Sequence, residues 1–337
     1  MSQPANPASQ LTLVLPGLIW PQQAMRDLTH DLATPALCAL LGKGELTSQP
    51  DKQWLLDAFG LTQAPPVAPL RVLGHGGIAA QDQWLCLDPI NLAFVERTVR
   101  VGNPAALKLT EAEAQSLCNA LAPTFAALGE LLATTPDQWH IRMHDTAPPL
   151  PDFAALTDCI GGRADQALPT DAVWRQLLND VQVMLHDHPV NLAREANGQV
   201  RVNSLWPWGG GTLPAQAKTS HDVVFGEGAV IQGLAKLCGV ATMPTPNAWQ
   251  PNSDGNPLVI LSPLERPRHQ GDGLRWREAL AELDVNWFAP LLSALRHGKL
   301  RHLKLIAPEA DGGRTLNVSR ASLLKFWRRP ITLSMIT

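Results

Sequence analysis

The sequence predicts an α/β protein with a doubly wound sheet core and an α+β insertion. Strand-like and helix-like segments alternate at both ends of the chain, a pattern typical of a parallel sheet covered by helices. The run "PLVILSP" at 257–263 is almost continuously apolar, as expected of a central strand buried on both faces. The 337 residues, of which 45% are hydrophobic and 17% charged, suffice for one large domain or two joined ones.

The N-terminal segment carries the first elements of this core. Residues 11–15 are a short apolar run bounded by turn residues, which predicts a buried strand. Thr34 and Pro35 suit the first turn of a helix, and Gly42 or Gly44 can close it. The proline-rich segment 65–69 indicates a domain boundary, so residues 1–65 are expected to belong to the core.

The middle of the chain changes character, because short strand-like pieces surround one long helix. That helix is predicted over 110–132, where Thr110 and Glu113 form a capping box. We expect an inserted α+β subdomain over 66–164, with the core resuming over 165–337. The strand-like pieces are 70–74, 84–89, 93–101 and 139–143.

The segment "LPTDAVWRQLLNDVQVMLHDHP" predicts an amphipathic helix. Val173, Leu177, Val181 and Leu185 recur every four residues, and Thr170 can cap the first turn. A buried strand is expected next, in "VNSLWPWGGG" at 202–211. Its glycines predict a place where the backbone approaches something closely. Further predicted elements are helices over 228–239 and 273–298 and a strand over 300–308.

Charge and cysteine usage exclude several classes of protein. A net charge of −3 argues against nucleic acid as a partner, and Arg328-Arg329 is interpreted as solvated surface. No apolar run is long enough to span a bilayer, and the polar start lacks a signal peptide, so we expect a cytoplasmic protein without a membrane partner. Five scattered cysteines favour reduced thiols over a disulfide or zinc framework: Cys38, Cys86, Cys118, Cys159 and Cys238.

A cluster of histidines follows the helix that ends near 187. His186, Asp187 and His188, with Arg194, could bind a metal or a phosphate. The alternative is that one histidine caps a helix, another is solvated and Arg194 pairs with a carboxylate. The short HxH spacing favours this second interpretation.

Two glycine-rich stretches and one charged loop are further candidates. Backbone N–H groups in 209–211 and 74–77 could face an anion, although neither stretch has the spacing of a P-loop or a dinucleotide fingerprint. Glu265 and His269 follow the predicted central strand, where ligand-bearing loops are expected, and both side chains suit a divalent transition metal. A solvated loop is the alternative. No nucleophile elbow or HExxH motif is present.

Four segments resemble the archaeal-type, cofactor-independent phosphoglycerate mutases of the alkaline phosphatase superfamily, and more closely a bacterial branch of RpfE-type regulatory proteins. "TPALCALLGKG" resembles the family's "TPNLDxLAxxG", and "HPVNLAREANGQVRVNSLWPWGGG" is similar to its "HPxNxxRxxxGxxxANxxxxWGxG". "GEGAVIQGLAKLCGV" resembles "xxxDLxxGIAxLxGM", and "ERPRHQGDGLRWREALAELD" resembles "DEAGHxGDxxxKxxAIExID". The resemblance implies an alkaline-phosphatase-like sheet core.

The resemblance also implies a site. The family moves a phosphoryl group between positions of phosphoglycerate with two divalent metals and a serine nucleophile. It places metal ligands at Glu265 and His269, for manganese or zinc if the site is functional. The positions implied to face the substrate or an anion are His188, Asn191, Arg194, Asn203, Trp208, Gly209, Gly210 and Gly211.

Departures from the family pattern predict that its chemistry is lost. Pro16 stands where the family has an aspartate ligand, the serine nucleophile segment has no counterpart around Ser48, and no histidine follows the strand at 300–308. We therefore expect a catalytically degenerate relative with a regulatory or ligand-sensing role, without cofactor, whose partner is a small phosphorylated acid or a protein. The alternatives are an active metal-dependent phosphomutase or phosphatase with a rearranged site, using His186, His188, Glu265 and His269, and a protein–protein interaction module.

Overall fold

A computed structural model describes residues 10–50, 53–95, 97–167, 169, 171–250, 255–309, 312–325 and 327–335. The chain forms two compact units, one of residues 1–64 and 216–337 and the other of residues 65–215. They are called unit 1 and unit 2 below. The first boundary falls at the predicted proline-rich segment.

The second boundary differs from the predicted one, because residues 165–215 belong to unit 2 and not to the core. The strand β8 (Ser204–Gly211) pairs along its length with β3 (Trp84–Ile90), and the helix α8 (Ala172–His186) packs on β8. A segment hydrogen-bonded to the central strand of the insertion cannot belong to the other sheet.

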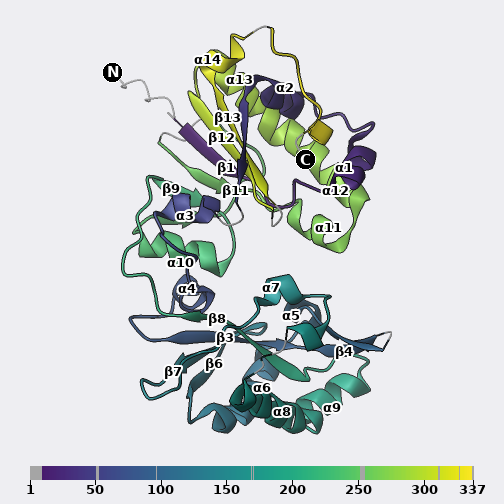
Figure 1. The fold of residues 1–337 in the computed structure, drawn as a ribbon, viewed down its shortest axis with the longest axis vertical. Coiled ribbons are helices and arrows are strands. Elements are labelled where there is room, and N and C mark those ends of the chain that lie inside the picture. Colours follow the sequence, from purple (N-terminus) through teal and green to yellow (C-terminus); the bar gives the residue numbers. More distant parts are fainter. Residues whose placement is uncertain are drawn as a thin grey trace. The chain divides into compact units, whose positions relative to one another are not determined.

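Unit 1 is an α/β domain around a seven-stranded sheet of order β10-β9-β11-β1-β12-β13-β2 (Figure 1). Its first five strands are mutually parallel, whereas β13 and β2 run antiparallel to their neighbours. The strands are β1 (Gln10–Val14), β2 (Glu45–Gln49), β9 (Val223–Phe225), β10 (Ala241–Met243), β11 (Leu258–Ile260), β12 (His302–Ala307) and β13 (Gly313–Ser319).

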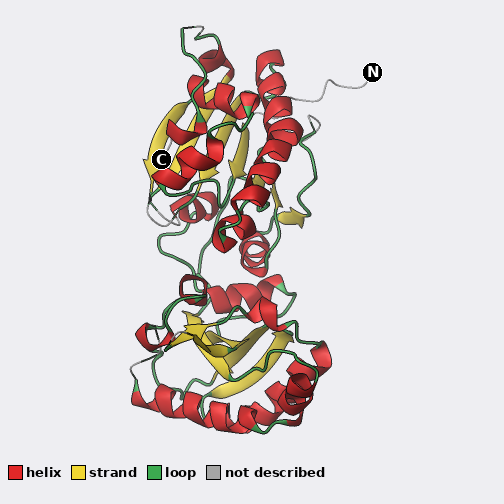
Figure 2. Ribbon diagram, turned by 90° about the vertical axis from the view of Figure 1, so that its right-hand side faces the viewer, coloured by secondary structure: helices red, strands yellow, loops and turns green. Residues whose placement is uncertain are grey.

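The helices of unit 1 lie on both sides of this sheet (Figures 1 and 2). Leu11, Leu13 and Leu15 face one core with α2, α12 and α13, while Val14 on the opposite face is also fully buried. The helices are α1 (Gln22–Thr29), α2 (Pro35–Lys43), α3 (Gln53–Phe59), α10 (Ala229–Leu237), α11 (Glu265–Gln270), α12 (Gly273–Leu283), the π-helical turn η2 (Asp284–Phe288), α13 (Ala289–His297), α14 (Arg320–Leu323) and the short turn η3 (Leu333–Met335).

Unit 2 is an α+β domain around a four-stranded antiparallel sheet of order β6-β7-β3-β8. One face packs against α6, α8 and α9, and the other against α4 and α7 (Figure 1). Its other elements are α4 (Val67–Gly74), β4 (Leu92–Val95), β5 (Thr98–Val101), α5 (Pro104–Leu107), α6 (Glu111–Phe125), β6 (Gly129–Thr135), β7 (Gln138–Met143), α7 (Leu156–Cys159), the 3-10 turn η1 (Ala164–Gln166) and α9 (Pro189–Ala196).

Most predicted elements of the core are confirmed. Residues 10–14 form β1, Thr34 precedes α2, and 258–260 form a strand between β9 and β1. The predicted helix over 273–298 runs from α12 through η2 to α13 and closes at Gly298, whose φ of 73° suits glycine.

Two predicted elements of unit 2 are wrong. The piece 70–74, predicted as a strand, belongs to α4, which tolerates Pro69 because the first-turn N–H groups of a helix lack intrahelical partners. The helix predicted over 110–132 ends at Phe125, and β6 follows. A Cβ on Gly129 would come within 2.1 Å of the Arg142 carbonyl oxygen, so strand pairing requires glycine there.

The buried stripe of α8 agrees with the predicted one at Val181 and Leu185 and is shifted by one residue at its first two positions. Trp174 and Leu178 are buried with Val181 and Leu185, whereas Val173 is 59% exposed. The N-cap is Asp171, which accepts bonds from two backbone N–H groups, and the predicted cap Thr170 lies outside the described residues. Within the described ranges no helix is long and apolar enough to cross a membrane.

Candidate functional site

The carboxyl edge of the unit 1 sheet brings together the ends of β1, β11 and β12. Ligand sites in open parallel sheets are expected at this edge. A cavity of about 220 Å³ lies there, and the positions predicted as metal ligands, Glu265 and His269, both line it. Its complete lining is Pro16, Gly17, Glu265, Arg268, His269, Pro308 and Glu309.

A basic side chain lies in this cavity beside the acidic ones. Arg268 Nη2 is 3.7 Å from Glu309 Oε1, and each of these side chains is 24% exposed. Arg268 Nε donates a hydrogen bond to the Ile19 carbonyl, 2.8 Å away, and the guanidinium stacks over Trp20 at 5.0 Å. The arginine is therefore fixed by a carbonyl and an indole, with the carboxylate contributing a loose contact.

The residues of this edge do not fit the two-metal site that the resemblance implies. Among the described residues, which leave out Ala310 and Asp311, no three His, Cys, Asp or Glu side chains are placed to hold a metal ion. Pro16, which has no donor side chain, lies at the end of β1, and the Arg268 guanidinium would repel a divalent cation. Glu265, His269 and Glu309 share the cavity wall without forming a coordination group.

A second cavity, of about 750 Å³, opens at the same edge around the ends of β9, β10 and β11. Glu227 and Glu282 are its charged lining residues, with Trp287 among the apolar ones. Neither carboxylate has an ion pair with any described residue. This part of the edge is acidic, which disfavours binding of a phosphorylated acid there.

The residues of unit 2 that match the family motif form a buried network. Arg194 is 1% exposed, and each of its three guanidinium nitrogens bonds to protein. Nε donates to the Val200 carbonyl, Nη1 to Glu113 Oε1 at 2.9 Å, and Nη2 to the Leu107 carbonyl. Burial raises the pKa of Glu113, but hydrogen bonds from Thr110 and Arg194 outweigh it and lower that pKa.

Asn191 and His188 make structural hydrogen bonds in and around α9. Asn191 is fully buried, and its amide bonds to the Leu185 carbonyl and to both backbone groups of Val202. His188 is the N-cap of α9, where Nδ1 accepts the Val190 N–H at 3.2 Å, and partial burial lowers its pKa. Asn203 pairs with both backbone groups of Leu92. These side chains hold the chain entering β8.

Trp208 belongs to a second buried group, between α4 and the sheet. Its indole N–H donates to Asp88 Oδ2 at 2.8 Å, and the Arg71 guanidinium lies 4.7 Å from its ring centre. Arg71 Nη1 also bonds to both oxygens of Asp88 at 2.8 and 3.0 Å. Burial raises the pKa of Asp88, and bonds from Arg71, Trp208 and the Trp139 N–H oppose that rise.

The glycines of β8 approach protein atoms closely. A Cβ on Gly209, whose φ is +63°, would come within 2.8 Å of the Val67 Cβ, and one on Gly211 within 2.8 Å of the Pro66 Cβ. Gly210 would meet Leu150 at 2.6 Å. The close approach predicted for this stretch is thus made to the start of α4 and its surroundings.

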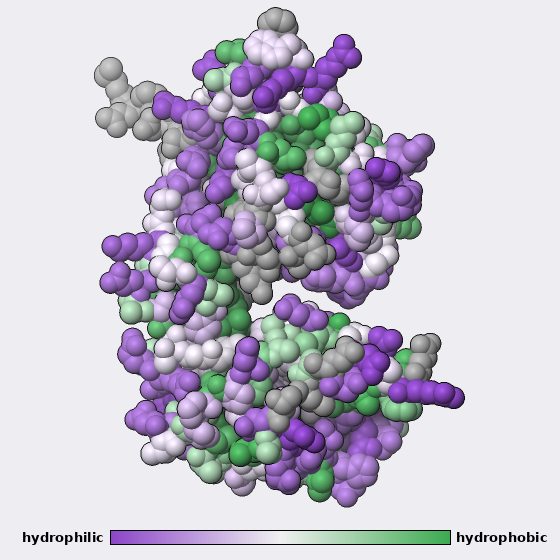
Figure 3. All heavy atoms as spheres, in the orientation of Figure 1, coloured by the Kyte–Doolittle hydropathy of each residue, from purple (hydrophilic) through white to green (hydrophobic). Residues whose placement is uncertain are grey.

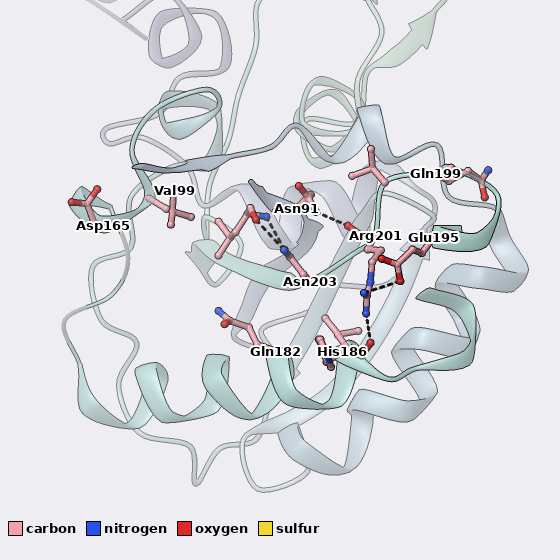
Figure 4. Close-up of a pocket in the computed structure, with 14 residues that line it drawn as sticks. Asn91, Val99, Asp165, Gln182, His186, Glu195, Gln199, Arg201 and Asn203 are labelled. Atoms are coloured by element: carbon pink, nitrogen blue, oxygen red, sulfur yellow. Dashed lines mark hydrogen bonds and ion pairs between the residues drawn. The ribbon is translucent and has the colours of Figure 1, made fainter. Parts of the chain in front are cut away.

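A cavity of about 900 Å³ in unit 2 is lined by two of the predicted residues, His186 and Asn203. Figure 4 shows Arg201 reaching from its strand-like segment toward Glu195 and the His186 carbonyl, both of which it bonds. Asn91 donates to the Arg201 carbonyl. The polar groups of this cavity are largely paired with one another.

The predicted residues therefore fall into separate sets. Glu265 and His269 share a cavity in unit 1, whereas the other predicted positions lie in unit 2 and bond mainly to protein groups. The sequence reasoning missed Arg268 and Glu309 at the edge and the pair Arg71–Asp88. Arg268 lies within the quoted "ERPRH" segment, but no spacing rule marks Asp88, a lone carboxylate in an apolar strand.

The fold and this edge define an alkaline-phosphatase-like α/β protein, and solved structures share that fold. The cofactor-independent phosphoglycerate mutase of Thermoplasma acidophilum matches with a TM-score of 0.53 and 16% identity, over 98% of this chain and 95% of that one. A protein of Pyrococcus horikoshii matches with a TM-score of 0.60 and 14% identity, over 93% and 88% of the two chains. The predicted fold class is confirmed.

Comparison of the sequence with known proteins finds partial matches to phosphoglycerate mutases. A stretch of 98 residues is 34% identical to the 2,3-bisphosphoglycerate-independent phosphoglycerate mutase of Methanosarcina acetivorans, covering 26% of this chain and 24% of that protein. A stretch of 87 residues is 34% identical to the enzyme of the same name from Methanosarcina mazei, covering 25% of this chain and 21% of that protein. The matched stretch spans about a quarter of these relatives, and no family model matches the chain. The chain is thus similar to these mutases over about a quarter of its sequence, and it shares the fold of a cofactor-independent phosphoglycerate mutase.

Proposed function

We propose that this chain is a phosphoglycerate-mutase-like protein, of the RpfE-type regulatory branch, that has lost metal-dependent phosphoryl transfer and acts in regulation or ligand sensing. One observation carries the proposal. At the carboxyl edge of the sheet, Pro16, Glu265, Arg268 and Glu309 surround a cavity in which a guanidinium contacts a carboxylate. Two-metal chemistry needs several carboxylate and imidazole ligands at that place, and a fold persists without them.

The decisive experiment is a coupled phosphoglycerate mutase assay on the full chain with added manganese, against an EDTA-treated sample. We expect no turnover in either, and no stoichiometric manganese or zinc in protein purified without chelator. Metal-dependent turnover would overturn the proposal. The protein's folded state is checked in parallel by circular dichroism.

A second candidate is an active phosphomutase or phosphatase with a rearranged site. It is favoured by the fact that Glu265, His269 and Glu309 line one cavity, so a small movement of Arg268 would leave three donors together. This candidate predicts bound metal that is lost in Glu265→Gln and in His269→Gln. The variant His30→Gln, an exposed histidine of the same unit outside the cavity, should keep the metal.

A sensing role also predicts a ligand, proposed here to be a small phosphorylated acid. Calorimetric titration of the full chain with 3-phosphoglycerate tests it, and absence of binding would remove this ligand. The interaction-module alternative gains no support from the tryptophans. Of the eleven, only Trp327 is exposed, so they form no apolar surface patch.

A further inference from the structure

The C-terminal part of the chain carries an uneven share of positive charge. Residues 285–337 contain two acidic residues, Glu309 and Asp311, in a protein whose net charge is −3. The basic residues of the same stretch are Arg296, Lys299, Arg301, Lys304, Arg314, Arg320, Lys325, Arg328 and Arg329. Positive charge is therefore concentrated on the last elements of unit 1.

The fold gathers many of these residues at one end of unit 1. The strand β12 starts at His302, shortly after α13 ends, and β13 returns antiparallel so that Ser319 pairs with His302. The helix α14 follows at once, and its Arg320 N–H bonds to the Arg301 carbonyl. This is the amino edge of the parallel strands, opposite the edge that holds Glu265. In Figure 3 hydrophilic side chains cover the end of unit 1 where α14 lies, beside a hydrophobic group.

A small cavity of about 210 Å³ lies at this end. Its charged lining residues, Lys43, Arg296 and Arg320, are all basic. The remaining wall is apolar and consists of Ala39, Leu292, Leu323 and Leu324. The helices α2, α13 and α14 that form it contain no acidic residue.

Two of these cations are exposed and have no charged partner in the described part of the chain. Among the described residues, neither Arg296 nor Arg320 has an ion pair or a side-chain hydrogen bond. By contrast, Lys43 Nζ donates to the carbonyls of Lys325 and Arg328 at 2.8 and 2.7 Å. Arg320 is held in place by packing, because a Cβ on Gly298 would come within 2.8 Å of its Nη1.

Stabilisation of helix ends does not account for this much charge. The carboxyl ends of α2 and α13 meet here, and each contributes about half a negative charge. Arg328 Nη1 already bonds to the carbonyl of Gly44 at the end of α2. The three positive charges that line this cavity exceed the roughly one negative charge that two helix ends provide together.

We propose that this cavity binds a small organic anion, a carboxylate or phosphate monoester with a short aliphatic body. Two unpaired guanidinium groups match the paired oxygens of such anions, and the leucines can pack against a few methylene groups. The volume exceeds the roughly 30 Å³ of one water and lies below the range of about 300–1,000 Å³ typical of drug-sized ligands. The site lies away from the Glu265 cavity, so it stands whether or not the proposed function holds.

The test is isothermal titration of the full chain with succinate and with inorganic phosphate, at ionic strength held constant with sodium chloride. We expect saturable binding of at least one probe. Arg296→Gln and Arg320→Gln should each weaken it about 10-fold, as expected for loss of a charged hydrogen bond. Arg301→Gln removes the same charge from an exposed residue outside the cavity and should bind like the unchanged chain.

Three outcomes would overturn the proposal. One is absence of saturable binding for both probes, and another is binding that survives both arginine substitutions while thermal unfolding shows folded variants. In the third, the unchanged chain binds phosphatidylserine vesicles or polyglutamate but neither small anion, and the arginine variants lose that binding. That result would mean that the basic face docks a macromolecule.

Discussion

Arg194 in unit 2 and Arg268 in unit 1 both contact a carboxylate, but under opposite conditions. Arg194 is buried, bonds Glu113 at 2.9 Å and satisfies two carbonyls. Arg268 is 24% exposed and lies 3.7 Å from a similarly exposed Glu309. The contacts of the first arginine are structural. The second lies at the carboxyl edge of the unit 1 sheet, where the described residues form no group that could hold a metal ion.

The comparison teaches that residues expected to face a ligand can instead hold a domain together. Asn191, Arg194 and Trp208 each join elements of unit 2, so their loss would disturb that unit whatever its ligand. Pro16 and Arg268 are half-buried and line the cavity at the carboxyl edge of unit 1. The ion pair of Arg268 with Glu309 is too long and too solvated to hold that edge together.

The largest expected effect is that of Arg194→Met. It leaves the Glu113 carboxylate and the Leu107 and Val200 carbonyls without their donor, so unfolding of unit 2 should cost about 3 kcal/mol less. Urea denaturation followed by tryptophan fluorescence measures this. The control Arg201→Met removes a pair with the exposed Glu195 and a solvent-exposed bond to the His186 carbonyl, and it should cost only about 1 kcal/mol. Equal losses of unfolding free energy in both variants would show that the burial of Arg194 does not determine its contribution to stability.

Next comes Gly209→Ala, which tests the close approach of β8 to α4. It combines a left-handed backbone with a clash against Val67, and we expect a loss of about 2–3 kcal/mol. Gly76→Ala is the matched control, because Gly76 has a φ of +89° but open space around its Cβ position. A loss no larger than that of the control would refute the packing role of this glycine.

His140 provides a pH-dependent test of the unit 2 interior. Its Nε2 is buried and has no hydrogen-bond partner among the described residues, and burial, with nearby Arg71, lowers its pKa to about 3. The folded state therefore favours the neutral ring. Stability is fully present above the unfolded pKa of about 6.5 and is lost as pH falls toward 3, by up to about 2 kcal/mol at pH 5.

The measurement is urea denaturation at pH 7 and pH 5 for the unchanged chain and for His140→Leu. The leucine variant should lose less stability between the two pH values. His144→Gln, at an exposed histidine, should retain the full dependence. An unchanged pH dependence in His140→Leu would mean that other groups cause the acid sensitivity.

The smallest effect is expected at the edge of unit 1. Glu309→Gln should lower the free energy of unfolding by less than about 1 kcal/mol, because its ion pair with Arg268 is long and partly solvated. A double-mutant cycle with Arg268→Ala measures the coupling of the two side chains directly. A coupling comparable to that of Arg194 with Glu113 would remove the contrast between the two regions.

The sequence by itself determined the architecture of this protein. Short apolar runs separated by amphipathic helices specify β1, β11 and β12, because period and composition act locally. The capping box at Thr110 and the left-handed Gly298 likewise depend on neighbouring residues only. The proline-rich boundary at 65 was visible for the same reason.

Only the tertiary structure decided how the candidate site residues are used. Whether Arg194 meets a ligand or Glu113 depends on a residue 81 positions away, and the gathering of Lys43, Arg296 and Arg320 depends on where α2 and α13 end and α14 begins. The assignment of β8 to unit 2 follows from its pairing with β3, more than a hundred residues earlier. Such contacts join segments distant in the chain, so neither local propensity nor spacing encodes them, and the balance of burial and charge selects them only on folding.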